Sequence, residues 1–449
     1  MRLSCIWLIF PLVCGVAPSA LAADRTFTSF ASVKPVLDEY TDLLPAELRN
    51  PSEAKWSAWS KRQDKAIRTR LQQGDLDSMV NLLLYGTSFT KQPRIKVEGL
   101  TEASKAGTLR ARVEDLIAGL RSPGDNERLI FLSSLLRSKG IDPSEPAQTG
   151  VFIYNNLQRV IQEMVTLAKR SEEAERLTKP NGPPDPAAIF SWRPGLLRDR
   201  GVSLDTSIFP NFSIDQALRD LESRGVLREG QVAKVAVIGP GLDFSDKNAE
   251  YSYDYYPQQT LQPFALYDSL VRLGLARGNA VSMTILDISS RVIDHIQRAR
   301  ERAKKNTGYV IQLPREIARP WPPDLIGYWR SLGDRVGAEV APIRPPEIFL
   351  SLNDGQGLET RAVRIRTEVV LTCQPVDLNI VLERINLAEA DRFDLMVATN
   401  IFIYYGAFER ALALENAGAM LKHGGLLLTN DRLPEVPGGT MRQAGLTDV

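Results

Sequence analysis

The sequence predicts an α/β fold, in which a doubly wound, mostly parallel sheet follows a mostly α-helical N-terminal region. First, the C-terminal half alternates short β-branched runs with amphipathic stretches, as parallel sheets covered by helices do. Second, the run at 235–238 stops at Gly239-Pro240-Gly241, which is typical of a buried strand that enters a tight turn. Third, most segments before residue 230 have apolar residues at helical spacing.

Length and composition limit the possible classes of protein. A chain of 449 residues suggests two or three domains. Its 43% hydrophobic and 24% charged residues are ordinary for a globular protein. A net charge of +1 gives no reason to expect nucleic acid as a partner.

The first 22 residues have the pattern of a secretory signal peptide. Arg2 precedes an almost wholly apolar run, and Ala20-Leu21-Ala22 is a small-x-small cleavage signal before Ala23. The run is short for a membrane span, so we expect cleavage and no stable span afterwards. The protein is then periplasmic or secreted, and it is cytoplasmic if the signal interpretation is wrong.

Cysteine and histidine are scarce. After cleavage only Cys373 remains, so no internal disulfide can form. His295 and His423 are the only histidines, which leaves almost no material for a histidine-based metal site or a Ser-His-Asp triad. We therefore expect no metal centre.

Residues 23–230 form the expected helical region, in which we find no catalytic constellation. Ser52 precedes a helix whose inward face carries Trp56 and Trp59, and Ser213 is expected to open a later helix with a capping box. Further helices are expected at 75–84, 108–120, 125–139 and 152–177. A proline- and glycine-rich stretch at 179–186 marks a linker or exposed loop.

Residues 231–449 form the expected α/β domain. Strands are expected at 234–238, 280–288, 309–313, 363–372, 394–400 and 424–429. Two segments interrupt the alternation, a tyrosine-rich one at 251–264 and a proline-rich insertion at 314–359. Their tyrosines, Trp321 and Trp329 either line a pocket over the sheet or pack and join the domains. Both interpretations stay open.

Glycine and acidic or amide side chains follow the expected strands. Ligands of open α/β sheets bind beyond the carboxyl ends of the strands, and a carboxylate there can accept both hydroxyls of a ribose. These strand-end residues are Gly239, Gly241, Asp287, Asp377 and Asn400.

The region 234–431 resembles class I S-adenosylmethionine-dependent methyltransferases. The motifs that carry the resemblance are VAVIGPG at 235–241, TILDIS at 284–289, PVDLN at 375–379, FDLMVATNIFIYY at 393–405 and ENAGAMLKHGGLLLTND at 415–431. The last two look like the family's fourth strand and its "LKPGG" fifth strand. The sequence departs from the family in its two inserted segments and in ending without a clear closing hairpin.

The resemblance implies S-adenosylmethionine as cofactor and a role for each motif. Gly239 and Gly241 would pass close to the methionine part, and Asp287 would hold the ribose. Asp377 and Leu378 would flank the adenine, and Asn400 would line the methyl-transfer face. Asp287 as a cap of the next helix and Asn400 as a turn residue are the simpler alternatives.

Two functional hypotheses follow. The first is methyl transfer to an unidentified small-molecule or protein acceptor, by catalytic residues that the sequence does not identify. The second is an exported, non-catalytic binding protein with a degenerate methyltransferase-like domain, since the cofactor is made in the cytosol. A nicotinamide-dependent oxidoreductase is disfavoured, because Phe244 stands where the fingerprint needs a third glycine.

Overall fold

A computed structural model describes most of the chain after residue 24. The described residues are 25–74, 76–84, 95, 97–178, 208–242, 256–278, 280–317, 320–344, 357–431, 433, 439 and 441–447. The expected signal peptide at 1–22 and the expected linker at 179–186 lie outside them.

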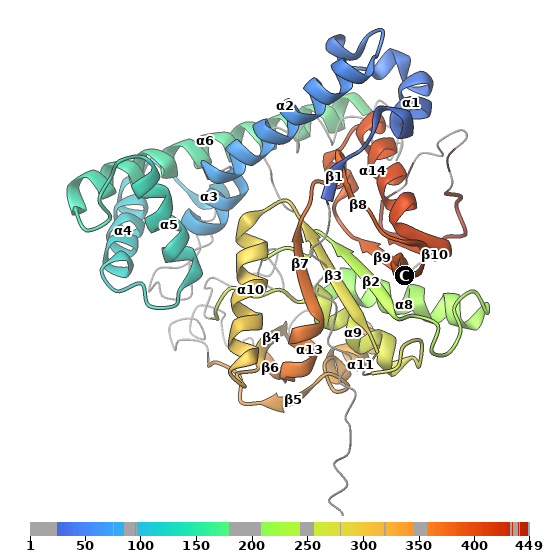
Figure 1. Cartoon of the computed structure of the whole chain (residues 1–449). Coiled ribbons are helices and arrows are strands. Elements are labelled where there is room, and N and C mark those ends of the chain that lie inside the picture. The colour runs from blue at the N-terminus through green and yellow to red at the C-terminus, as the bar shows by residue number, and fades with distance from the viewer. Residues whose placement is uncertain are drawn as a thin grey trace, which may run out of the picture.

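A five-stranded parallel sheet forms the centre of the α/β part (Figure 1). Its order is β10-β9-β2-β3-β7, all neighbours being parallel. If these five strands are numbered along the chain, their order from β7 to β10 is 3-2-1-4-5. This is a doubly wound order, and its switch point lies between β2 and β9. The strands are β2 (Lys234–Ile238), β3 (Ser282–Asp287), β7 (Cys373–Asp377), β9 (Phe393–Ala398) and β10 (Leu421–Thr429). The predicted α/β class is thereby confirmed.

Both faces of this sheet are buried, which explains the continuous apolar runs of its strands. Alternate residues of β2 point to opposite faces, so Val235 and Val237 join one core while Ala236 and Ile238 join the other. The first core includes residues of α8 (Ile208–Ser223), α9 (Gln262–Arg272) and α10 (Ser290–Lys304). The second includes residues of α1 (Phe30–Glu39), α2 (Glu53–Gln72) and α14 (Ala407–Met420).

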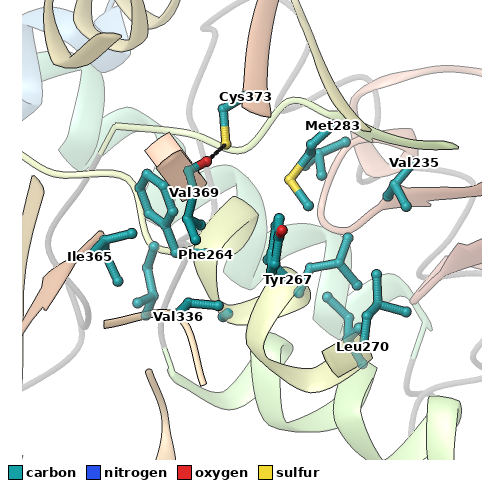
Figure 2. Close-up of a cluster of buried hydrophobic side chains, with 14 of the residues drawn as sticks. Val235, Phe264, Tyr267, Leu270, Met283, Val336, Ile365, Val369 and Cys373 are labelled. Carbon is teal, nitrogen blue, oxygen red and sulfur yellow. Dashed lines mark hydrogen bonds between the residues drawn. The ribbon is translucent and has the colours of Figure 1, made fainter. Parts of the chain in front are cut away.

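Figure 2 shows part of the first core, where side chains from the sheet, α9 and the segment before β7 meet. Met283 of β3 is wholly buried, and Tyr267 and Phe264 of α9 are nearly so. Cys373, at the start of β7, is also buried, and its thiol donates to the Val369 carbonyl at 3.8 Å. Burial raises the pKa of this thiol to about 12, so Cys373 is a core residue and no reactive thiolate.

A second, three-stranded sheet corrects two predicted strands. β4 (Tyr309–Glu316) and β5 (Gly337–Val340) both pair antiparallel with β6 (Leu358–Ile365). The apolar runs at 309–313 and 363–372 were therefore wrongly expected in the parallel sheet. Periodicity shows that a segment is a strand but says nothing of its partner or direction. The third parallel strand is β7, which follows the short helix α13 (Thr367–Thr372).

The N-terminal region is helical, as predicted. Ser52 caps α2 and Asn126 caps α5 (Glu127–Ser138), each through a side-chain acceptor. The helices α3 (Leu76–Leu83), α4 (Glu102–Leu120), α5 (Glu127–Ser138) and α6 (Pro146–Thr178) share a core of their own within residues 79–161. The expected start at Ser213 was wrong, because α8 begins at Ile208 and Ser213 lies inside it.

The first described residues pack on the α/β part and not on those helices. β1 (Arg25–Phe27) pairs antiparallel with β8 (Glu383–Ile385), and α1 lies beside α14 (Figure 1). Trp56 and Trp59 of α2 belong to the second core of the parallel sheet. No helix in the described part of the chain is long and apolar enough to cross a bilayer.

A buried chain of hydrogen bonds joins the helical region to α10 and to the three-stranded sheet. Glu127 at the start of α5 lies 2.7 Å from His295 Nδ1, and His295 Nε2 lies 2.7 Å from the Tyr309 hydroxyl. The Tyr309 oxygen also accepts from the Thr260 amide at 2.7 Å. His295 and Tyr309 are almost fully buried, so each partner satisfies a polar group that water cannot reach.

We expect Tyr309→Phe to destabilise the fold. The change leaves the Thr260 amide and His295 Nε2 without their partner, and an unsatisfied buried polar group costs about 1–3 kcal/mol. Urea unfolding followed by circular dichroism measures the difference. Tyr154→Phe on α6 is the control, because its hydroxyl makes only a 3.5 Å contact with Gln158, which is exposed. Equal midpoints for the two variants would contradict the structural role of this chain of hydrogen bonds.

Candidate functional site

The turn after β2 lies at the switch point, where ligands of doubly wound sheets bind. Gly239 has φ +63° and Gly241 has φ +73°, a backbone conformation that favours glycine. The Gly239 amide donates to the Leu286 carbonyl of β3 at 2.8 Å. The turn therefore needs both glycines for its shape, and β3 holds it in place.

A side chain from the end of β9 packs directly on this turn. A Cβ atom added to Gly239 would lie 2.1 Å from Cδ1 of Ile401. The close approach that the sequence assigned to a cofactor is therefore made, in this structure, by Ile401. Gln262 Nε2 donates a hydrogen bond to Thr399 Oγ1. Since Gln262 is the first residue of α9, this helix begins beside the end of β9.

Asp287 ends β3, the strand next to β2, and is only partly buried. One oxygen accepts from the Ser289 amide at 2.8 Å, so the residue also shapes the turn into α10. Burial raises the pKa of Asp287 to about 7, and the charge of Asp377 adds to the effect while the amides of Ile288 and Ser289 oppose it. The carboxyl group is thus close to half-ionised near neutral pH, in the position predicted for a ribose ligand.

Asp377 lies beside Asp287, since the two residues are register partners at the ends of β7 and β3. Its carboxylate is held by two arginines of the N-terminal region. Arg68 Nη1 donates to Oδ1 at 2.5 Å, and Arg25 Nη1 lies 3.1 Å from Oδ2. Arg25 Nη1 also donates to the Asp377 carbonyl at 2.9 Å. The residue predicted to reach an adenine amino group is therefore engaged inside the protein.

Leu378 does not line an opening. Its side chain is 2% exposed and belongs to the second core, and its amide donates to the Asp287 carbonyl at 2.9 Å. The next residue, Asn379, is equally buried and donates to Asp64 of α2 at 3.0 Å. The predicted place of Leu378 against an adenine ring is therefore filled by packing in this conformation.

Asn400 serves the turn after β9, in agreement with the simpler of its two interpretations. It has φ +57°, and its amide donates to Asn430 Oδ1 at 2.8 Å. In return Asn430 Nδ2 donates to Asn400 Oδ1 at 2.6 Å. This reciprocal pair joins the carboxyl ends of β9 and β10.

Both tryptophans of the inserted segment have packing contacts, which favours the second of the two open interpretations for them. Trp329 is 3% exposed in the first core and its indole donates to the Leu313 carbonyl, so it packs the insertion. Trp321 is partly buried and stacks edge-on with Phe209, with ring centroids 5.6 Å apart. Within the two inserted segments, residues 251–255, 318–319 and 345–356 lie outside the described residues.

The residues at this edge differ in how well they suit the separate parts of S-adenosylmethionine. Asp287 ends β3 with a carboxylate of the kind that can accept ribose hydroxyls, whereas Ile401 occupies the face of Gly239 that the methionine part would need. Asp377 and Leu378 are engaged by arginines and by the core. Among the described residues, Asp287 alone suits the cofactor in this conformation, while Gly239, Asp377 and Leu378 have partners inside the protein.

Comparison with known proteins identifies no relative: no family model and no curated protein matches the chain. Within the described ranges, no group of three or more His, Cys, Asp or Glu side chains is placed to hold a metal ion. The candidate site therefore rests on the fold and on the residues at the carboxyl edge of its parallel sheet.

We expect Gly239→Ala to destabilise the protein more than Gly424→Ala does. Both glycines have positive φ, which costs a side chain about 1–2 kcal/mol, but only Gly239 has Ile401 in the way. Overpacking adds about 1–3 kcal/mol at Gly239, whereas nothing lies within 4 Å of a Cβ at Gly424. Thermal unfolding of both variants measures the difference.

The double variant Gly239→Ala/Ile401→Ala separates the two contributions. Removing the Ile401 side chain relieves the clash and leaves only the backbone strain. Ile401→Ala should therefore cost less stability when it is combined with Gly239→Ala than when it is made alone. Additive effects of the two substitutions would rule out a direct contact.

Proposed function

We propose that the carboxyl edge of β2 and β3 binds the adenosyl part of S-adenosylmethionine and that the protein transfers its methyl group to an acceptor. The observation that carries the proposal is Asp287, a partly buried acid at the end of the strand next to the switch point. The sheet order supports it, because it places Gly239 and Asp287 at one edge.

Each residue has a defined part in this proposal. The ionised Asp287 accepts hydrogen bonds from the two ribose hydroxyls, which a carboxylate with two oxygens can do together. Gly239 and Gly241 shape the turn beside which the methionine part would lie, and Ile401 must move away from Gly239 for it to bind there. The cofactor, when bound, supplies a methyl group on a cationic sulfur, whose transfer needs little acid–base help. Positioning of the acceptor then provides much of the rate.

The second candidate is an exported binding protein without methyl transfer. The observation that favours it is that Asp377, Leu378 and Asn400 all have partners inside the protein. Isothermal titration with S-adenosylhomocysteine separates the candidates: binding supports the first, and no binding by any form of the full-length protein supports the second.

We expect Asp287→Ala to lower the affinity for S-adenosylhomocysteine by at least about tenfold. The substitution removes two hydrogen bonds to a charged acceptor, each worth about 1.5–3 kcal/mol, and about 1.4 kcal/mol is one decade. Asp294→Ala is the matched control, because Asp294 is an exposed acid on the following helix. Unchanged affinity in a folded Asp287→Ala variant would contradict the ribose assignment.

The affinity is also expected to rise with pH. Because the pKa of Asp287 is raised to about 7, the carboxyl group is mostly protonated at pH 6 and mostly ionised at pH 8. The ionised form is the stronger acceptor, so affinity should rise by up to about tenfold over this range. Folding stability changes in the opposite direction. The Asp287 carboxyl group ionises near pH 4 in the unfolded chain and near pH 7 in the folded protein. The folded protein therefore loses stability as the pH rises from about 4 to 7.

Titrations of the wild-type protein and Asp287→Ala at pH 6, 7 and 8 test this dependence. The wild-type affinity should rise and that of the variant should stay level. A parallel rise in both proteins would assign the titration to another group.

A further inference from the structure

We propose that the first described residues, Arg25–Phe27, form a strap that covers the adenine end of the site and is displaced when the cofactor binds. The strap is the strand β1, and it lies on β8 next to the end of β7. The proposal rests on the function proposed above. It assigns a role to the contacts that Arg25 makes with Asp377.

Arg25 is the part of the strap that contacts the site. One of its guanidinium nitrogens contacts both Oδ2 and the carbonyl oxygen of Asp377, at 3.1 and 2.9 Å. These are the acceptors that a nucleobase amino group would need, on the strand adjacent to Asp287. Arg25 and an adenine therefore compete for the same atoms.

The Arg25 end of the strap is weakly held, whereas Phe27 packs against the second core. The ion pair is 43% and 42% exposed at its two side chains, and exposed ion pairs contribute little to stability. The ladder joins only Arg25, Thr26 and Phe27 to residues 383–385, and a short two-stranded sheet is marginal by itself. Displacement of Arg25 therefore has a small cost, and displacement of Phe27 adds the loss of its packing against the second core.

Thr28 is the pivot at which the displacement ends. Its amide donates to the Leu382 carbonyl at 2.9 Å, and its hydroxyl donates to Asn416 Oδ1 at 2.6 Å. Trp56 Nε1 donates to its carbonyl at 2.7 Å, and the residue is only 2% exposed. The chain after residue 28 is thus fixed to α2, α14 and the segment before β8, and only the strap can leave.

Arg68 stays behind when the strap leaves. It contacts Asp64 at 2.8 Å, Asp377 at 2.5 Å and Glu383 at 3.2 Å, and its side chain is 21% exposed. Asp377 consequently keeps one cationic partner in the open state. When Arg25 alone leaves, the charge of Asp377 is still paired with Arg68. The strap can therefore act as a reversible cover.

Titration of the full-length protein with S-adenosylhomocysteine tests the strap. Arg25→Ala removes the competing guanidinium and should tighten binding by about two- to fivefold relative to the wild type, as expected for one exposed ion pair. Arg62→Ala is the matched control, because Arg62 forms a similarly exposed ion pair with Glu47 within the N-terminal region. The affinity of Arg62→Ala for S-adenosylhomocysteine should equal that of the wild type.

Hydrogen exchange of the same proteins provides a second readout. Saturating S-adenosylhomocysteine should accelerate amide exchange in the strap and leave Thr28 unchanged. Binding of equal strength in Arg25→Ala and the wild type, or slower exchange of the strap on binding, would overturn the strap and leave the cofactor site standing. If neither protein binds, the proposed function fails and the strap fails with it.

Discussion

One carboxylate, that of Asp394, fixes the strands on which the candidate site depends. Its Oδ2 accepts from the amides of Ala233 and Lys234 at 2.9 and 2.8 Å, and its Oδ1 accepts from Lys422 at 2.6 Å. Although burial opposes the charged form, these donors hold the pKa of Asp394 below its usual range. The starts of β2, β9 and β10 are thereby tied together. Because side chains alternate along a strand, this register decides which residues face each core and which ones reach the carboxyl edge.

The sequence was sufficient to predict the residues that this register brings to the edge, because they follow strands with strong local signals. Gly239 follows one apolar, β-branched run and Asp287 ends a second one. Both positions could therefore be assigned from a few neighbouring residues of the sequence. The antiparallel pairing of β4 with β6 could not be predicted in this way. Its cause is the inserted segment between them, which supplies β5 and α11 (Pro323–Ser331) and returns the chain in the opposite direction.

The contacts that Asp377 and Gly239 make within the protein could also not be predicted from the sequence, for a different physical reason. Arg25 and Arg68 reach Asp377 across 352 and 309 residues of sequence, and an arginine on a strand or helix carries no local sign of its distant partner. Ile401 is similar, since its contact with Gly239 depends on the parallel pairing of β2 with β9. The N-terminal region is therefore more than a neighbour of the sheet: β1 and α2 supply groups to the edge where the cofactor is proposed to bind.

The central claim is that the edge formed by Gly239, Gly241 and Asp287 is a nucleoside site, and a crystal structure of the full-length protein with S-adenosylhomocysteine tests it most directly. We expect density across the turn after β2, with both ribose hydroxyls within hydrogen-bond distance of Asp287 and Arg25 withdrawn from Asp377. A ligand bound elsewhere on the protein, with Asp287 still bonded only to the Ser289 turn, would contradict it.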